Sequence, residues 1–180
     1  MRATGIVRRI DDLGRIVIPK EIRKTMHIRE SDPLEIFTER DGSIILKKYS
    51  PIGEMSTAAQ QYTDAVAASL PHTVCVCDQD SVIAASGPNG KKLLGKMLHE
   101  HAEEALHDRK QIMLDKKEAG FFPLVSDFPE EFVEIALSTI IAEGDAIGLV
   151  CILSNEGPLT DQDLLMTKIG ASFLGKQMED

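Results

Sequence analysis

Basic side chains recur through residues 5–24, where they alternate with apolar ones instead of forming a continuous block. They are Arg8, Arg9, Arg15, Lys20, Arg23 and Lys24. The planar fork of arginine binds phosphate or the edge of guanine through two parallel hydrogen bonds, whereas lysine acts as a point charge that favours phosphate. Held on short strands and one helix, such side chains indicate contact with a polyanion. The alternative is a solvated charged surface that has no ligand.

The charge of the chain is divided unevenly between its two ends. Residues 1–50 contain eleven Lys and Arg against eight Asp and Glu, a net charge of +3, whereas residues 51–180 contain nine against twenty-one, a net charge of −12. The overall charge of −9 therefore hides a basic segment attached to an acidic one. Such an asymmetry is typical of a polyanion-binding piece joined to a piece with another role.

Short elements position the basic residues. β-Branched residues predict strands over residues 4–10 and 15–18, separated by the turn sequence Asp11-Asp12-Leu13-Gly14. Pro19 favours a helix over residues 19–26, and Asp41-Gly42 predicts a hairpin whose strands are residues 33–38 and 43–47. Because fifty residues bury little apolar surface alone, we expect this segment to pair with a second copy of itself.

After a joint at residues 49–53, the chain alternates between helical and strand-like patterns. The expected helices are 55–70, 91–109 and 161–178, and the expected strands are 74–78, 81–86, 121–125, 133–141 and 146–153. Gly95 is a possible break in the second helix, and Thr160 with Asp163 forms a capping-box pattern before the third. This order indicates an α+β domain. The apolar stripes of its first and last helices pack on their own sheet or against a second subunit, which would join dimers into a tetramer.

Three cysteines are the nucleophilic side chains of the second segment. Cys75 and Cys77 alternate within one strand and so share a face, and Cys151 lies in another apolar run. We predict that they are small buried hydrophobic residues, because a reactive thiol needs a partly exposed, electropositive setting. The alternative is a thiol enzyme.

Other groups with chemical potential give weaker patterns. His99 and His101 are two residues apart on an expected helix, so we predict that they face different directions and bind no metal. The sequence Gly87-Pro88-Asn89-Gly90-Lys91-Lys92 is similar to the end of a phosphate-binding loop, but Ala85 stands where that loop requires its first glycine. We interpret it as a turn before a helix, and we predict no catalytic residue, no metal site and no cofactor.

The apolar runs of the chain are short. They do not reach the about 20 residues of a membrane helix, and the opening residues have no signal-peptide core. We therefore expect a cytoplasmic, nucleoid-associated protein without a membrane partner.

Residues 2–50 resemble the AbrB-type swapped-hairpin domain of bacterial transition-state regulators. The resemblance rests on the basic positions named above and on the surrounding sequence Leu13-Gly14-Arg15-Ile16-Val17-Ile18-Pro19. It implies that Arg8, Arg15 and Arg23 contact DNA. The fourth basic position of the family is Lys24 here. A lysine can still contact phosphate, but it cannot form two parallel hydrogen bonds to the edge of a base. Further candidates for DNA contact are Arg2, Arg9 and Lys20.

The resemblance implies a fold class, α+β, made of two domains. Residues 1–50 would form a swapped-hairpin β-barrel from two interleaved chains, and residues 51–180 a GAF-like regulatory or oligomerisation domain, as in a sporulation-stage member of the family. The implied function is sequence-specific regulation of transcription, by activation, repression or both. The implied partners are double-stranded DNA and further copies of the chain, as dimer and tetramer, together with an unidentified small-molecule effector near residues 85–92.

Two alternative functions belong to other classes. AbrB-like domains also occur in antitoxins of toxin–antitoxin pairs, which usually carry a short, flexible, toxin-wrapping tail instead of a globular domain. Some GAF-type domains reduce free methionine sulfoxide with cysteines, which would make the protein a thiol enzyme. We expect no enzymatic activity.

Overall fold

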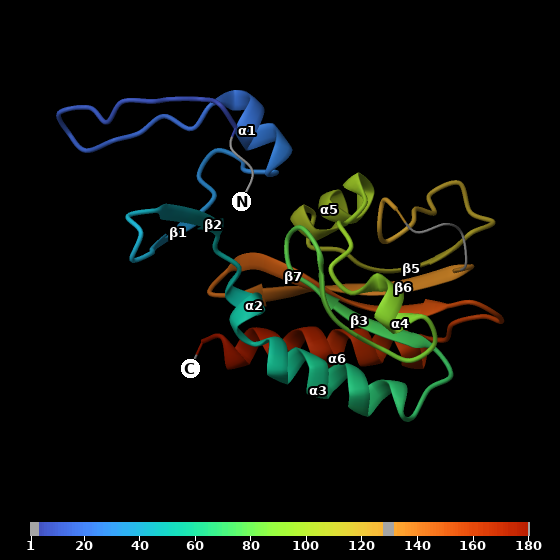
Figure 1. Ribbon diagram of the computed structural model, residues 1–180. Helices are drawn as coiled ribbons and strands as arrows, with labels where there is room; N and C mark the ends of the chain where they lie inside the picture. Colours follow the sequence, from blue (N-terminus) through green and yellow to red (C-terminus); the bar gives the residue numbers. More distant parts are fainter. Residues whose placement is uncertain (1–3, 128–131, 180) are drawn as a thin grey trace. The chain divides into compact units, whose positions relative to one another are not determined.

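Two units make up the chain, residues 1–49 and residues 50–180. The computed structural model describes residues 4–127 and 132–179 (Figure 1). Within these ranges, none of the helices combines the length and the apolar character needed to cross a membrane.

In the N-terminal unit, residues 1–49, the described residues 4–49 contain one helix and one hairpin. The helix α1 (Lys20–Thr25) begins directly after Pro19, whose fixed φ of −57° suits a helix start. Strands β1 (Leu34–Thr38) and β2 (Ile44–Lys48) pair antiparallel. Gly42 closes the hairpin with a φ of +88°, a conformation that favours glycine. The predicted helix and hairpin are confirmed.

The strands predicted over residues 4–10 and 15–18 are wrong for the single chain. Both segments run as extended chain on either side of a turn (Figure 1), and the backbone hydrogen bond that links them joins Asp11 N–H to the Arg15 carbonyl at 3.0 Å. Strands form only where a neighbouring strand accepts and donates backbone hydrogen bonds. Their apolar side chains are exposed as well, with 89% of Val7 and 71% of Val17 accessible.

The C-terminal unit, residues 50–180, is built on a five-stranded antiparallel sheet in the order β4-β3-β7-β6-β5. The strands are β3 (Thr73–Cys77), β4 (Val82–Ser86), β5 (Gln111–Asp115), β6 (Glu134–Ala142) and β7 (Asp145–Ser154). The central strands β3, β6 and β7 are almost wholly buried, because both faces of the sheet are covered.

Helices cover the two faces of this sheet differently (Figure 1). One face packs against α3 (Ser56–Ala67) and α6 (Asp161–Gln177). Helix α3 follows the short helix α2 (Pro51–Glu54). The other face is covered by α4 (Gly90–Leu93), α5 (Glu100–His107) and the loop at 121–125. The predicted capping box is confirmed, since the Asp163 carboxylate accepts a hydrogen bond from Thr160 N–H at 2.8 Å.

Close approach fixes α6 against its neighbours. A side chain at Gly175 would collide with the Ile141 carbonyl oxygen, and one at Gly170 with the ring of Tyr62 on α3. The Tyr62 hydroxyl donates to the Met166 carbonyl at 2.6 Å, and burial raises the pKa of Tyr62 to about 12.

Two predictions for the C-terminal unit need correction. Residues 121–125 form no strand; Val125 makes one isolated bridge to Leu98. Their apolar pattern reflects burial of a loop, since Phe122 and Leu124 pack into the core without strand pairing. Strand β5, which pairs with β6, was not predicted. The helix expected over 91–109 is not continuous. It is interrupted between α4 and α5, and the possible break predicted at Gly95, which has a φ of +76°, is confirmed.

Candidate nucleic-acid interface

The turn at residues 11–15 is organised by the Asp11 carboxylate. Its oxygens accept hydrogen bonds from Leu13 N–H at 3.0 Å, from Arg15 N–H at 2.7 Å and from the Arg15 guanidinium at 2.8 Å. Gly14 has a φ of +77°, which a side chain would strain. The Arg15 backbone and side-chain donors hold the pKa of Asp11 below its usual value. The turn therefore presents Arg15 in a defined position although 70% of its side chain is exposed.

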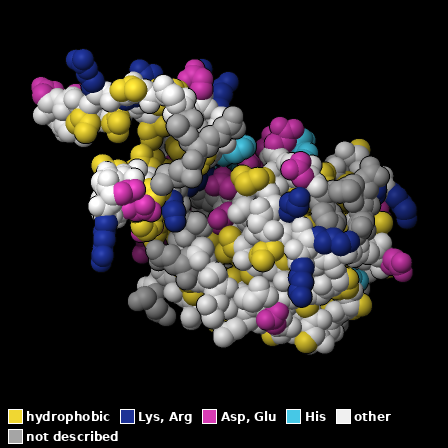
Figure 2. All heavy atoms as spheres, viewed as in Figure 1, with side chains coloured by type: hydrophobic (Ala, Val, Ile, Leu, Met, Phe, Trp, Pro, Cys, Tyr) yellow, Lys and Arg dark blue, Asp and Glu magenta, His cyan; other side chains and the backbone are white. Residues whose placement is uncertain are grey.

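Arg8 and Arg9 lie on the extended segment before this turn and are exposed. Arg8 also lines a pocket of about 340 Å³ within the N-terminal unit. We call it the apolar pocket. Its other walls are Ile6, Ile16, Val17, Ile18, Pro19, Ile22, Met26, Ile28 and Leu46. Figure 2 shows apolar side chains, in yellow, on the surface of this unit. A single chain thus leaves uncovered the apolar side chains that would form a core.

Helix α1 carries three more of the basic candidates. Lys20, Arg23 and Lys24 line a depression of about 280 Å³, and His27, Ile28 and Arg29 complete its walls. Lys20 and Lys24 are exposed and Arg23 is half-buried. Basic side chains around one concavity suit an anion such as a phosphate group.

The sequence-based prediction missed His27 and Arg29. The chain reverses after α1 because His27 adopts a left-handed φ of +52°, and Ile28 N–H donates to the Arg23 carbonyl at 2.8 Å. The Asp32 carboxylate then accepts from Arg29 N–H at 2.7 Å and pairs with Lys48 at 3.2 Å. The sequence did offer one signal for this part of the site: Arg29 is a basic residue three positions beyond the expected end of the helix.

The structure therefore groups some of the predicted residues and separates others. Lys20, Arg23 and Lys24 share one depression, whereas Arg15 is held at the turn and Arg8 lies at the apolar pocket. Arg2, the remaining candidate, lies outside the described residues.

The cysteines of the C-terminal unit are buried, as predicted. Cys75, Cys77 and Cys151 are each fully inaccessible, and their sulfur atoms lie within 4.8 Å of one another. Hydrogen bonds from the Cys151 and Cys77 thiols lower the pKa of Cys75, while hydrogen bonds from Cys151 and Cys75 raise the pKa of Cys77. Burial raises the pKa of Cys151.

The prediction that His99 and His101 face different directions is wrong. His99 precedes α5 with an extended backbone, so the helical spacing does not apply, and the two rings lie 5.1 Å apart. With Glu100 they place three potential metal ligands within 4.8 Å of one another. His101 and Glu100 are exposed, and His99 Nδ1 accepts a hydrogen bond from His101 N–H.

Concavities lie among the described residues of the C-terminal unit. One, of about 250 Å³, is mostly apolar and is bounded by Leu93, Leu124 and Leu153, with Lys116 at its wall. Another, of about 620 Å³, includes Pro88 and Asn89 from the segment where an effector was expected.

Comparison with known proteins gives matches to both units. The family model described as stage V sporulation protein T C-terminal, transcription factor, matches residues 54–179. Residues 7–54 match the model described as antidote-toxin recognition MazE, bacterial antitoxin.

Two curated proteins of Bacillus subtilis (strain 168) are similar to the chain. Stage V sporulation protein T is 46% identical over 179 residues, which cover 99% of each protein. The transition state regulatory protein AbrB is 59% identical over 51 residues, which are 28% of this chain and 52% of that protein.

A solved structure is similar to the C-terminal unit. It is a type II free methionine-R-sulfoxide reductase from Thermoplasma acidophilum, with a TM-score of 0.54, 13% identity and coverage of 71% of this chain and 94% of that one. At this identity, the likeness shows the fold alone.

An AbrB-like N-terminal unit joined to an α+β unit that matches a transcription-factor family defines a two-part transcription regulator, and the expected α+β fold class is confirmed. The chain belongs to the stage V sporulation protein T family.

Proposed function

We propose that the protein is a sequence-specific DNA-binding regulator of sporulation-stage transcription that activates, represses or does both. The observation that carries the proposal is the set of basic side chains on the turn and on α1, in a region 59% identical to a transition state regulator. Arg8, Arg15 and Arg23 read bases or clamp phosphates through two hydrogen bonds, and Lys24 neutralises phosphate. Arg9, Lys20 and Arg2 add further positive charge.

Pairing of two N-terminal units completes the DNA-binding surface. The apolar pocket and the exposed valines of the extended segments are the surface that a second copy would cover, and its strands would supply the missing backbone partners. Two copies of each basic residue then face the duplex, as a symmetric dimer requires.

The C-terminal unit joins such dimers into a tetramer in this proposal. Helix α6 carries an exposed apolar stripe, of which Leu165, Ile169 and Phe173 are 51%, 51% and 47% accessible. Exposed apolar stripes of this kind mark surfaces that pack against another subunit. The apolar cavity of about 250 Å³ is the place we assign to an unidentified small-molecule effector.

We assign the protein no reaction. Its named relatives in the family are transcription factors. The three thiols are fully buried, the opposite of the partly exposed electropositive setting that a nucleophilic thiolate needs.

A binding assay on the full chain tests the DNA proposal. Arg15→Ala and Arg23→Ala should each abolish specific operator binding and leave the circular dichroism spectrum unchanged. Arg40→Ala removes the same charge from the tip of the β1–β2 hairpin and is the matched control, which should bind nearly as wild type. The logarithm of the binding constant should fall with the logarithm of salt concentration by a slope of about −0.9 per phosphate neutralised. Normal binding by both arginine variants, or a flat salt response, would refute the assignment.

An antitoxin is the second candidate, because residues 7–54 match an antidote family. Against it, the following segment is a folded domain that matches a transcription-factor family instead of a short toxin-wrapping tail. Genome-wide mapping of bound DNA, with and without residues 51–180, separates the two. A transcription regulator should occupy many promoters, whereas an antitoxin should occupy essentially its own.

A further inference from the structure

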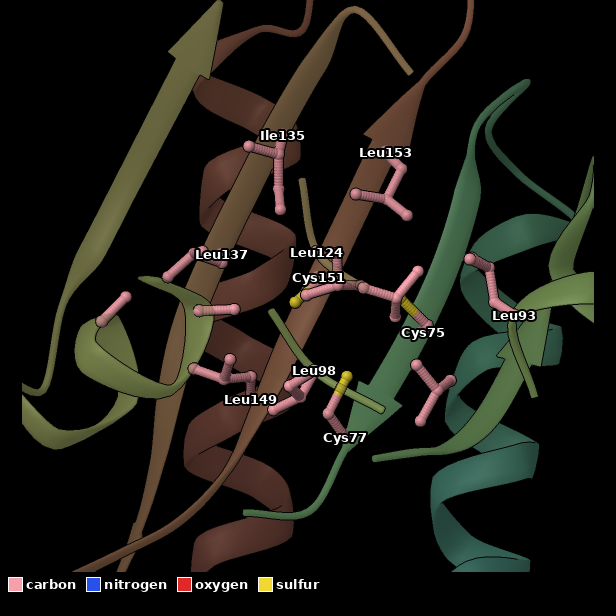
Figure 3. Close-up of a cluster of buried hydrophobic side chains, with 14 of the residues drawn as sticks. Cys75, Cys77, Leu93, Leu98, Leu124, Ile135, Leu137, Leu149, Cys151 and Leu153 are labelled. Carbon is pink, nitrogen blue, oxygen red and sulfur yellow. The ribbon is translucent and has the colours of Figure 1, made fainter. Parts of the chain in front are cut away.

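Three thiols converge on one face of the sheet in the C-terminal unit. Cys75 on β3 and Cys151 on β7 are direct partners in the antiparallel register, and Cys77 lies two residues further along β3 on the same face. Their sulfur atoms all lie within 4.8 Å of one another. Figure 3 shows the three side chains in the buried cluster of this face.

We propose that Cys75, Cys77 and Cys151 form a binding site for a soft, divalent, thiophilic metal ion of the zinc(II) class. Sulfur-only donor sets select such ions over calcium or magnesium, which prefer oxygen. Three sulfurs bound to a tetrahedral zinc at about 2.3 Å are about 3.8 Å apart. The observed sulfurs therefore need to close by only about 1 Å to reach that geometry.

The surroundings of the sulfurs decide the charge of the ion. Leu98, Leu124 and Leu137 belong to the same buried apolar cluster, where a net charge is costly. Three thiolates around a divalent ion leave a net charge of −1, whereas around a monovalent ion they leave −2. Burial thus favours the divalent ion.

A cavity beside the cysteines provides a route of access. The apolar cavity of about 250 Å³ is bounded by Leu93, Leu124 and Leu153, which pack in the same cluster as the cysteines. A metal ion reaches the sulfurs when these leucines shift, and its binding releases the thiol protons to solvent.

The test uses the reduced full chain after removal of metal with a chelator. Cadmium(II) is titrated while the ultraviolet sulfur-to-cadmium charge-transfer band is followed, and zinc(II) is then added as competitor. The expected result is one cadmium per chain, proton release that accompanies binding, and loss of the band on addition of zinc. X-ray absorption of the zinc form should show three sulfur neighbours.

Variants locate the site. Cys77→Ala and Cys151→Ala should each weaken cadmium binding by more than the about 10–100-fold that is typical of an outer-shell partner. Val76→Ala is the matched control: it lies between two of the cysteines but on the opposite face, loses buried volume and keeps all three sulfurs. It should bind cadmium as wild type.

Several outcomes would overturn the proposal. These are no charge-transfer band in the wild-type chain, a stoichiometry other than one per chain, or unchanged binding by Cys151→Ala. Should the cysteine variants fail to fold by circular dichroism, the absorption spectrum of the wild-type zinc form decides alone. Fewer than three sulfur neighbours in that spectrum refutes the site.

Discussion

Replacing Val17 by Ser tests whether the apolar pocket of the N-terminal unit is the surface on which two chains pair. Val17 lines that pocket, yet 71% of the side chain is accessible in the single chain. A valine this exposed, in an extended segment without a strand partner, gains stability only when another chain covers it.

The size of the effect follows from the exposed fraction. Full burial of a valine side chain contributes about 1.5–3 kcal/mol, so covering the accessible 71% of Val17 contributes about 1–2 kcal/mol per chain. A twofold dimer contains the substitution twice, which gives a loss of about 2–4 kcal/mol in the free energy of association. The dimer dissociation constant should therefore rise by about 30- to 700-fold. This is an upper value because Ser retains the Cβ.

Analytical ultracentrifugation of the full chain over a range of concentrations measures this change. At concentrations where the wild type is fully assembled, Val17→Ser should have half the wild-type mass and weaker operator binding. Leu13→Ser is the matched control, because Leu13 is 70% exposed but lies on the turn, outside the apolar pocket. If the two variants sediment alike, or if Val17→Ser keeps the wild-type mass at every concentration, the pocket is not the pairing surface.

Three further predictions address the C-terminal helix, the turn and the α3–α6 contact. Phe173→Ser on α6 should halve the mass measured by light scattering and spare DNA binding by each dimer, and an unchanged mass would count against the tetramer. Asp11→Ala removes the side-chain acceptors of the turn and should reduce operator affinity by about tenfold or more, whereas Asp11→Asn keeps a side-chain oxygen and should lose less. Since the folded pKa of Asp11 is lowered, its contribution is complete above its ordinary value of 3.8 and is lost as pH falls through the lower folded value; the amide NMR signal of Arg15 should shift only there. Tyr62 has a raised pKa, so its contribution is complete below pH 10 and is lost as pH rises through about 12. Phenolate absorbance of a Tyr49→Phe chain, in which Tyr62 is the remaining tyrosine, should appear near pH 12, and a midpoint near 10 would contradict the burial argument.

Structural features that depend on residues close together in the sequence were predicted well. The capping of α6 by Thr160 and Asp163, and the hairpin turn at Asp41-Gly42, depend on contacts only a few residues apart. The turn that holds Arg15 belongs to the same group, because Asp11 supplies its acceptors from four residues away. Local chemistry of this kind can be read before the fold is known.

Features that depend on distant pairing could not be predicted in the same way. The alternation of Cys75 and Cys77 indicated a shared face, but their meeting with Cys151 depends on the register between β3 and β7, which no local signal specifies. Residues 121–125 and strand β5 were misjudged because an apolar pattern reports burial and does not report which backbone groups pair. Likewise, the reversal at His27 that brings Arg29 to the basic depression uses a left-handed conformation that histidine adopts only occasionally.

The division of charge explains why DNA recognition and pairing should depend on each other in this protein. Residues 1–50 carry only +3 and residues 51–180 carry −12, so general attraction of the whole chain to a polyanion is weak or repulsive. At physiological salt, charges further apart than about 8 Å are largely screened. The affinity for DNA then depends on the few basic side chains that touch the duplex. One N-terminal unit offers too few such contacts to offset the loss of rotational and translational freedom on binding. A rigid pair of units doubles the contacts for a single loss of that freedom, so a substitution that weakens the pairing surface should also weaken operator binding, even where it leaves every basic side chain in place.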